Sequence, residues 1–101
     1  MNHYPIWVKP SAQNDFISAV DYYESKMPGL GNKLLEEINN SLKRIEVQPL
    51  IGIKIYKNFY QILTRKFPIR IIYTFINKEI QIYAFFHQSR QFQKLINKLD
   101  T

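Results

Sequence analysis

The chain has 101 residues, of which 46% are hydrophobic and 15% aromatic, and its formal net charge is +6 at pH 7. This composition indicates one folded domain over residues 1–101 and excludes an intrinsically disordered chain. The absence of cysteine excludes a disulfide framework and a thiolate metal site. No apolar run reaches the length of about 18 residues that a membrane span needs, and the first ten residues lack the pattern of a secretory signal. We therefore expect a cytoplasmic protein with no membrane association.

The positive charge is concentrated in the second half of the chain. Residues 1–52 contain five Lys/Arg and six Asp/Glu, a net charge of −1, whereas residues 53–101 contain nine Lys/Arg and two Asp/Glu, a net charge of +7. A half-molecule with this balance is expected to bind an anionic partner such as RNA, DNA or an acidic protein segment. A solubilising surface is the alternative reading of the same count.

The first half of the sequence predicts a strand followed by two helices. Residues 4–9 are aromatic and β-branched, and Pro10 ends them, which is typical of a short strand. Ser11 occupies the expected N-cap of a first helix, and the glycines and proline of residues 27–31 end that helix. A second helix follows and ends before Pro49. Together they predict an antiparallel helical hairpin, whose apolar stripes are Ala12, Phe16, Ala19, Val20, Tyr23 and Met27 in one helix and Leu34, Leu35, Ile38, Leu42 and Ile45 in the other.

Beyond Gly52 the hydrophobic period changes to two, which predicts a meander of four antiparallel strands. The opposite faces of the last two strands are also apolar, so these strands are expected to be central. A short C-terminal helix is predicted from about Gln91. The predicted fold is α+β in the order β-α-α-β-β-β-β, with the hairpin packed on a small antiparallel sheet and the short C-terminal helix last. The alternating sets are Ile53/Ile55, Ile62/Thr64, Ile69/Ile71/Tyr73/Phe75 and Ile80/Ile82/Ala84/Phe86.

Five segments of the sequence match a known family in order and spacing. They are "AVDYY" (19–23), "MPGLGNKLLEEI" (27–38), "PLIG" (49–52), "KFPIRIIY" (66–73) and "IQIYAFFHQSR" (80–90). With them the chain resembles the ParE/RelE superfamily of toxins from bacterial type II toxin–antitoxin modules. The Pro-Gly-Leu-Gly linker, the Phe-Pro that opens a strand and the strand-end His-x-x-Arg are more similar to the ParE-type branch than to the ribonuclease branch.

This resemblance implies a toxin that inhibits growth by binding DNA gyrase and is neutralised by a cognate antitoxin in a toxin–antitoxin hetero-oligomer. The alternatives are a RelE-like endoribonuclease that cleaves mRNA on the ribosome and a degenerate, non-toxic antitoxin-binding module. The resemblance places His87 and Arg90 as the strand-end pair. Relatives often carry an arginine near the start of the strand before Phe-Pro, where this chain has "FYQIL" (59–63). If that arginine helps to engage the target, the resemblance implies either a weakened toxin or substitution by Arg65 or Arg70.

Cleavage of RNA by its 2′-hydroxyl needs a general base, a general acid and cations for the developing charge. His87 or Tyr83 could move protons, but the ribonuclease relatives usually place a tyrosine after the strand-end arginine, and this chain has none there. A non-enzymatic inhibitor is therefore favoured, with His87 and Arg90 catalytic only in a ribonuclease. His87 has no cysteine or second histidine near it in the sequence, so we expect neither a metal nor a cofactor. The candidate residues for binding the target or partner are Arg65, Arg70, Tyr83, His87, Arg90, Lys94 and Lys98.

An acidic or amphipathic antitoxin segment is expected in the groove between the hairpin and the sheet. There it would bury apolar side chains and pair with Arg65, Arg70 or Arg90.

Overall fold

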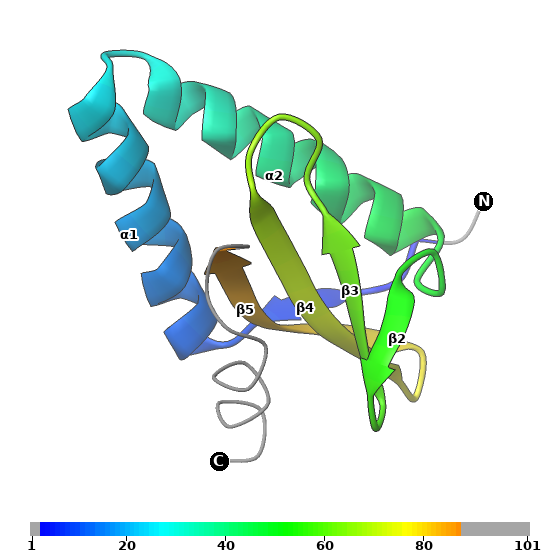
Figure 1. Ribbon diagram of the computed structural model, residues 1–101. Coiled ribbons are helices and arrows are strands. Elements are labelled where there is room, and N and C mark those ends of the chain that lie inside the picture. Colours follow the sequence, from blue (N-terminus) through cyan, green and yellow to red (C-terminus); the bar gives the residue numbers. More distant parts are fainter. Residues whose placement is uncertain (1–2, 88–101) are drawn as a thin grey trace.

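The computed structural model describes residues 3–87, and the predicted C-terminal helix lies outside them together with Arg90, Lys94 and Lys98. Within the described range the order of elements is the predicted one (Figure 1). The elements are β1 (Ile6–Val8), α1 (Pro10–Lys26), α2 (Leu30–Val47), β2 (Ile53–Tyr56), β3 (Phe59–Leu63), β4 (Ile69–Ile76) and β5 (Glu79–His87).

The sheet has the strand order β1-β5-β4-β3-β2. Strands β2 to β5 form the predicted antiparallel meander, and β4 and β5 are central, as predicted. The first strand adds a feature that the sequence pattern did not indicate, because β1 pairs parallel with β5, with Ile6 opposite Ile80 and Val8 opposite Ile82. A parallel partner requires a long crossover, and here α1, α2 and the meander provide it. The sheet is therefore mixed, with β1 at one edge and β2 at the other.

Both helices lie on one side of the sheet, and α2 crosses behind β3 and β4 in the view of Figure 1. We call this side of the sheet the hairpin face and the opposite side the far face. Burial of the predicted helical stripes against the hairpin face forms the main core, although Met27, just beyond α1, and Leu35 are exposed. Fully or almost fully buried members of this core are Ala12, Leu34, Ile38, Ile45, Ile69, Ile71, Tyr73, Ile80 and Ile82.

The start of α1 differs from the prediction. The helix begins at Pro10, and its N-cap is Lys9, whose backbone is extended and whose side chain makes no capping hydrogen bond. Proline suits the first helical position because its fixed φ is helical and the N–H that it lacks would have no partner there. The prediction that Ser11 is the N-cap was therefore wrong.

The turn between the helices depends on Glu24 and two glycines. The Glu24 carboxylate accepts hydrogen bonds from the backbone N–H groups of Gly29, at 3.0 and 3.1 Å, and Gly31, at 3.0 Å. It thereby satisfies donors at the N-terminus of α2 and opposes the positive end of its dipole. Gly29 has φ of 91°, and a Cβ at Gly31 would lie 3.0 Å from the carbonyl oxygen of Val20. The "PGLG" sequence thus allows the two helices to approach closely.

A β-bulge in β5 changes which side chains face the hairpin. Ile72 pairs with Ala84 and Tyr73 pairs with Ile82, so Tyr83 is an extra residue in β5. The bulge interrupts strict alternation: Ile80 and Ile82 contribute to the hairpin-face core, whereas Ala84 and Phe86 cluster with Ile72 on the far face. The prediction that all four alternating β5 residues share one face was therefore wrong for the last two, and Phe85 packs toward the hairpin instead.

Candidate functional site

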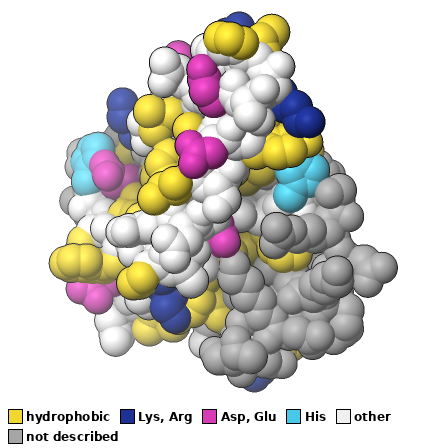
Figure 2. All heavy atoms as spheres, turned by 90° about the vertical axis from the view of Figure 1, so that its left-hand side faces the viewer, with side chains coloured by type: hydrophobic (Ala, Val, Ile, Leu, Met, Phe, Trp, Pro, Cys, Tyr) yellow, Lys and Arg dark blue, Asp and Glu magenta, His cyan; other side chains and the backbone are white. Residues whose placement is uncertain are grey.

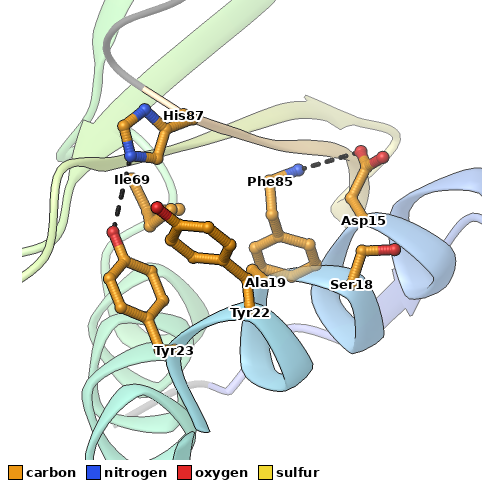
Figure 3. A pocket seen from close by; sticks show the side chains of 8 residues that line it. All are labelled: Asp15, Ser18, Ala19, Tyr22, Tyr23, Ile69, Phe85 and His87. Carbon is orange, nitrogen blue, oxygen red and sulfur yellow. Dashed lines mark hydrogen bonds between the residues drawn. The ribbon is translucent and has the colours of Figure 1, made fainter. Parts of the chain in front are cut away.

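A cleft of about 410 Å³ lies between α1 and the end of β5. Figure 3 shows Tyr22 and Tyr23 extending from α1 toward His87, with Asp15 and Ser18 at the other end of the cleft. Helical spacing places these α1 side chains on one side of the helix, since Asp15, Ser18 and Tyr22 are three and four residues apart. The lining residues are Asp15, Ser18, Ala19, Tyr22, Tyr23, Ile69, Phe85 and His87.

Two contacts fix α1 against β5 at the end of the cleft that contains Asp15. The backbone N–H of Phe85 donates to Oδ2 of Asp15 at 3.4 Å. The ring of Phe85 packs on that of Phe16, with 5.6 Å between ring centroids. The Asp15 carboxylate is therefore held at a defined position, half-buried, beside the aromatic wall of the cleft.

His87 lies at the opposite end of the cleft, where the Tyr23 hydroxyl is 3.4 Å from its Nε2. Burial raises the pKa of Tyr23, and the neighbouring Tyr22 raises it further. Tyr23 therefore keeps its proton at neutral pH and donates to Nε2 when that nitrogen carries no hydrogen. This contact ties the end of β5 to α1 and orients the imidazole.

The far face carries a different group, centred on Arg70. In the register of the sheet Arg70 lies opposite Phe86 and Gln61 lies opposite Ile72, on adjacent strands. Among the described residues, both Nε of Arg70 and Oε1 of Gln61 are buried without a hydrogen-bond partner. Burying an unsatisfied donor or acceptor is costly, and the cost is larger for a charged group.

The other predicted residues are distributed over several parts of the described chain. Tyr83, at the bulge, packs with the far-face cluster; its ring lies 4.8 Å from that of Phe59, and Nζ of Lys9 is 4.3 Å from its centroid. Arg65 lies in the exposed β3–β4 turn, where its backbone N–H donates to Glu37 at 3.0 Å.

The described residues do not bring His87 and Arg70 to one surface. His87 pairs with Ile69 in the register and shares the hairpin face with it, whereas Arg70 points to the far face. An acid, a base and a phosphate-binding cation must meet within hydrogen-bond reach of one phosphate for RNA cleavage. Within residues 3–87, that arrangement is absent around Arg70.

Sequence reasoning missed Asp15 and Gln61. Asp15 lies outside the apolar stripe on which the helix prediction relied. Its spacing to Tyr22, seven residues along the helix, is the signal that places both on one side. Gln61 gave no sequence signal, because its importance comes from the neighbouring strand.

No group of three or more His, Cys, Asp or Glu side chains in the part of the chain that the structure describes could hold a metal ion. Neither α1 nor α2 combines the length and apolarity that would let it cross a membrane.

The sequence over residues 6–92 matches the family model described as "ParE toxin of type II toxin-antitoxin system, parDE". No curated protein sequence matches the chain.

Several solved structures share the fold. A chain of the chromosomal ParDE toxin–antitoxin system from P. aeruginosa superposes with a TM-score of 0.74 at 17% identity, covering 84% of this chain and 96% of that chain. A double arginine-to-alanine mutant of the E. coli toxin RelE in the free state gives a TM-score of 0.68 at 13% identity, covering 97% and 96%. The same mutant in complex with a peptide of the antitoxin RelBc gives 0.64 at 14% identity, covering 96% and 94%.

Proposed function

Because the chain belongs to the ParE toxin family of type II toxin–antitoxin systems, we propose that it inhibits growth by binding DNA gyrase without cleaving RNA and that a cognate antitoxin neutralises it. The observation that favours a binding mechanism is the absence of a tyrosine after Arg90 in the sequence; the placement of His87 and Arg70 on opposite faces of the sheet agrees with it.

Arg70 is the residue we assign to target binding on the far face. Its buried Nε has no hydrogen-bond partner among residues 3–87, and within the same range Oε1 of the neighbouring Gln61 is an equally unpaired acceptor. An acidic side chain or a phosphate of the target would satisfy the guanidinium with charge-assisted hydrogen bonds. Around it lie Leu63 and Phe86, so the contact would form in an apolar setting where such bonds are stronger than in water.

His87 is assigned a structural role. Its contact with the Tyr23 hydroxyl joins β5 to α1, and its side chain faces the hairpin rather than the surface that carries Arg70. A binding toxin needs neither of the two proton transfers that RNA cleavage requires.

The charge and shape of the chain support the proposed neutralisation by an antitoxin. The second half carries the net charge of +7 counted above, which favours and accelerates association with an acidic segment. The cleft between α1 and β5 offers a place for side chains of that segment. One of the structurally similar chains is RelE bound to an antitoxin peptide, and we propose the same kind of partner for this protein. The product of an adjacent gene is the expected antitoxin.

The experiment is induced expression in a bacterial host, with growth, plasmid supercoiling and mRNA integrity followed in parallel. We expect growth arrest with altered plasmid supercoiling while mRNA stays intact, and rescue when the adjacent gene is co-expressed. Arrest with cleaved mRNA and normal supercoiling would instead favour a RelE-like endoribonuclease. Normal growth with a folded protein that still binds the antitoxin would favour a non-toxic module.

A further inference from the structure

We propose that the loop after α2 and the start of β2 form a docking surface for an acidic, amphipathic segment of the antitoxin. We call this surface the loop patch, and it consists of Leu50, Ile51 and Ile53. The inference rests on the proposed antitoxin neutralisation and specifies where the acidic residues of the antitoxin bind. Helix α2 begins beside α1 and ends on the other side of the molecule, so the loop patch lies away from the cleft between α1 and β5 (Figure 1).

The loop patch exposes three large aliphatic side chains within four residues of the chain. The exposed fraction is 65% for Leu50, 38% for Ile51 and 69% for Ile53. Four residues span at most about 14 Å, so one partner segment can cover all three side chains. Single exposed apolar side chains are normal on a protein surface, whereas a group of them marks an interaction site.

Hydrogen bonds hold the loop in its shape. The Tyr73 hydroxyl accepts the N–H of Gly52 and donates to the carbonyl oxygen of Pro49. The N–H of Ile51 donates to the carbonyl oxygen of Gln48 at 3.0 Å. A surface that is already formed loses little conformational entropy when a partner binds. The exposed side chains are therefore presented on a fixed backbone.

Two hollows lie on either side of Ile51, which lines both of them. The first has a volume of about 400 Å³ and is lined also by Leu50 and Phe75. The second has a volume of about 290 Å³ and is lined also by Lys43 and Arg44. Apolar anchors of a partner fit hollows of this kind. Acidic side chains next to such anchors would meet the two cations.

The charge around the loop patch favours an acidic partner. Residues 43–54 contain three basic residues and one acidic residue, a net charge of +2, and the acidic residue, Glu46, is hydrogen-bonded to His3. Helix α1 contains three acidic residues and one basic residue, a net charge of −2. Figure 2 views the molecule from the side of α1 and shows acidic side chains interspersed with hydrophobic ones. An acidic segment is therefore attracted to the loop patch and repelled by the outer side of α1.

The edge strand β2 argues against a second copy of this chain as the occupant. It has four residues, lies at the edge of the sheet, and its register with β3 shifts between Lys54 and Tyr56. A short, irregular edge that carries a lysine resists pairing with another strand. Two copies joined here would also place the net charge of +2 of residues 43–54 against the same charge. The loop patch therefore suits a partner of opposite charge.

The first test measures the affinity of the full-length protein for the purified product of the adjacent antitoxin gene. A double variant, Leu50→Ser with Ile53→Thr, removes apolar surface from exposed positions. We expect it to weaken binding by about tenfold or more, as truncation of apolar anchors does. Ile17→Gln is the matched control, because Ile17 is 56% exposed on α1, and it should change the affinity by less than about twofold. Unchanged melting temperatures show that the variants are folded.

A second series tests the charge. Lys43→Gln should slow association about threefold at low salt and leave dissociation almost unchanged, as loss of a charge at the rim of an interface does. Lys33→Gln is its control, since Lys33 is exposed on the same helix about 15 Å nearer its start. Each acidic residue of the antitoxin is then replaced by its amide. One replacement should lose its effect in the Lys43→Gln background, which is the signature of direct coupling.

The outcomes separate the two proposals. If the wild-type protein binds the antitoxin and the double variant binds it equally well, only this inference fails. If the wild-type protein does not bind the antitoxin at all, the proposed neutralisation fails and the inference fails with it. If the double variant binds the antitoxin normally but inhibits gyrase less, the loop patch contacts the target instead. If it changes the oligomeric state of the protein alone, a second copy occupies the patch. Either of these last two results overturns the inference.

Discussion

The hydroxyl of Tyr73 lies 3.0 Å from the backbone nitrogen of Gly52 and accepts its N–H, and it donates to the carbonyl oxygen of Pro49 at 2.7 Å. One phenol on the central strand β4 thus holds both ends of the "PLIG" loop that follows α2. A Cβ at Gly52 would lie 2.5 Å from this hydroxyl and 2.8 Å from the carbonyl oxygen of Gln61. Glycine is required because the loop passes so close to the sheet.

Replacing Tyr73 by phenylalanine tests this connection. The change leaves the Gly52 N–H and the Pro49 carbonyl without their partner, and we expect a loss of about 1–3 kcal/mol in the free energy of unfolding. Tyr22→Phe is the control, since Tyr22 is 53% exposed, and its effect should stay within about 0.5 kcal/mol. Chemical denaturation measures the free energy of unfolding of both variants. Equal midpoints for Tyr73→Phe and wild type would show that the loop is held by other contacts.

Stability should also depend on pH through Tyr73. Burial raises the pKa of Tyr73 above its ordinary value of 10.0; Tyr60 raises it further, and the hydrogen bond from Gly52 lowers it in part. The unfolded chain therefore releases this proton first, and stability falls as pH rises above about 10. Below about pH 10 Tyr73 is protonated in both the folded and the unfolded chain, and its stabilising contribution is fully present. Thermal melts of the wild type should show a steeper loss above pH 10 than melts of Tyr73→Phe. Parallel pH profiles would contradict the assignment.

Arg70→Met separates a target-binding role from a structural one. Methionine is unbranched and carries no charge, so it removes the partly buried guanidinium, whose Nε has no hydrogen-bond partner among the described residues. Replacing a buried charge by a well-packed apolar side chain is often neutral or stabilising. We expect an unchanged or higher denaturation midpoint together with reduced growth inhibition. A large loss of stability would mean that Arg70 is needed for folding, and full toxicity would mean that it does not contact the target.

His87→Gln distinguishes the two mechanisms of toxicity. Glutamine keeps a polar side chain near the Tyr23 hydroxyl but cannot transfer a proton near neutral pH. A ribonuclease that uses His87 would lose about 10²–10⁴-fold in activity, whereas a binding toxin should lose little. We expect induced cells to stop growing as they do with wild type. Relief of toxicity by a variant with an unchanged circular dichroism spectrum would argue for catalysis.

The order of elements and the buried stripes of both helices could be predicted because hydrophobic periodicity is a local property of the chain. Two features of the sheet could not be predicted from this periodicity. Parallel pairing of Ile6 with Ile80 depends on where the chain returns after the hairpin and meander, and the bulge at Tyr83 breaks the alternation on which the strand prediction relied. The consecutive apolar residues from Tyr83 to Phe86 are compatible with either register.

The candidate site was predictable only in part, for the same reason. His87 and Arg70 were both singled out from the sequence, but their placement on opposite faces follows from their register in the central strands. Asp15 and Tyr23 meet β5 only in the folded protein, through Phe85 and His87. Contacts between residues about 65 to 70 positions apart leave no pattern in a single sequence.

Supercoiling of relaxed plasmid by purified DNA gyrase, measured with increasing amounts of this protein, shows whether gyrase is its target. We expect that the wild-type protein inhibits supercoiling, that His87→Gln inhibits it to the same extent, that Arg70→Met inhibits it less, and that the purified antitoxin relieves the inhibition. Undiminished supercoiling at every concentration of a folded wild-type protein, with ribosome-dependent cleavage of mRNA by the same preparation, would contradict this expectation.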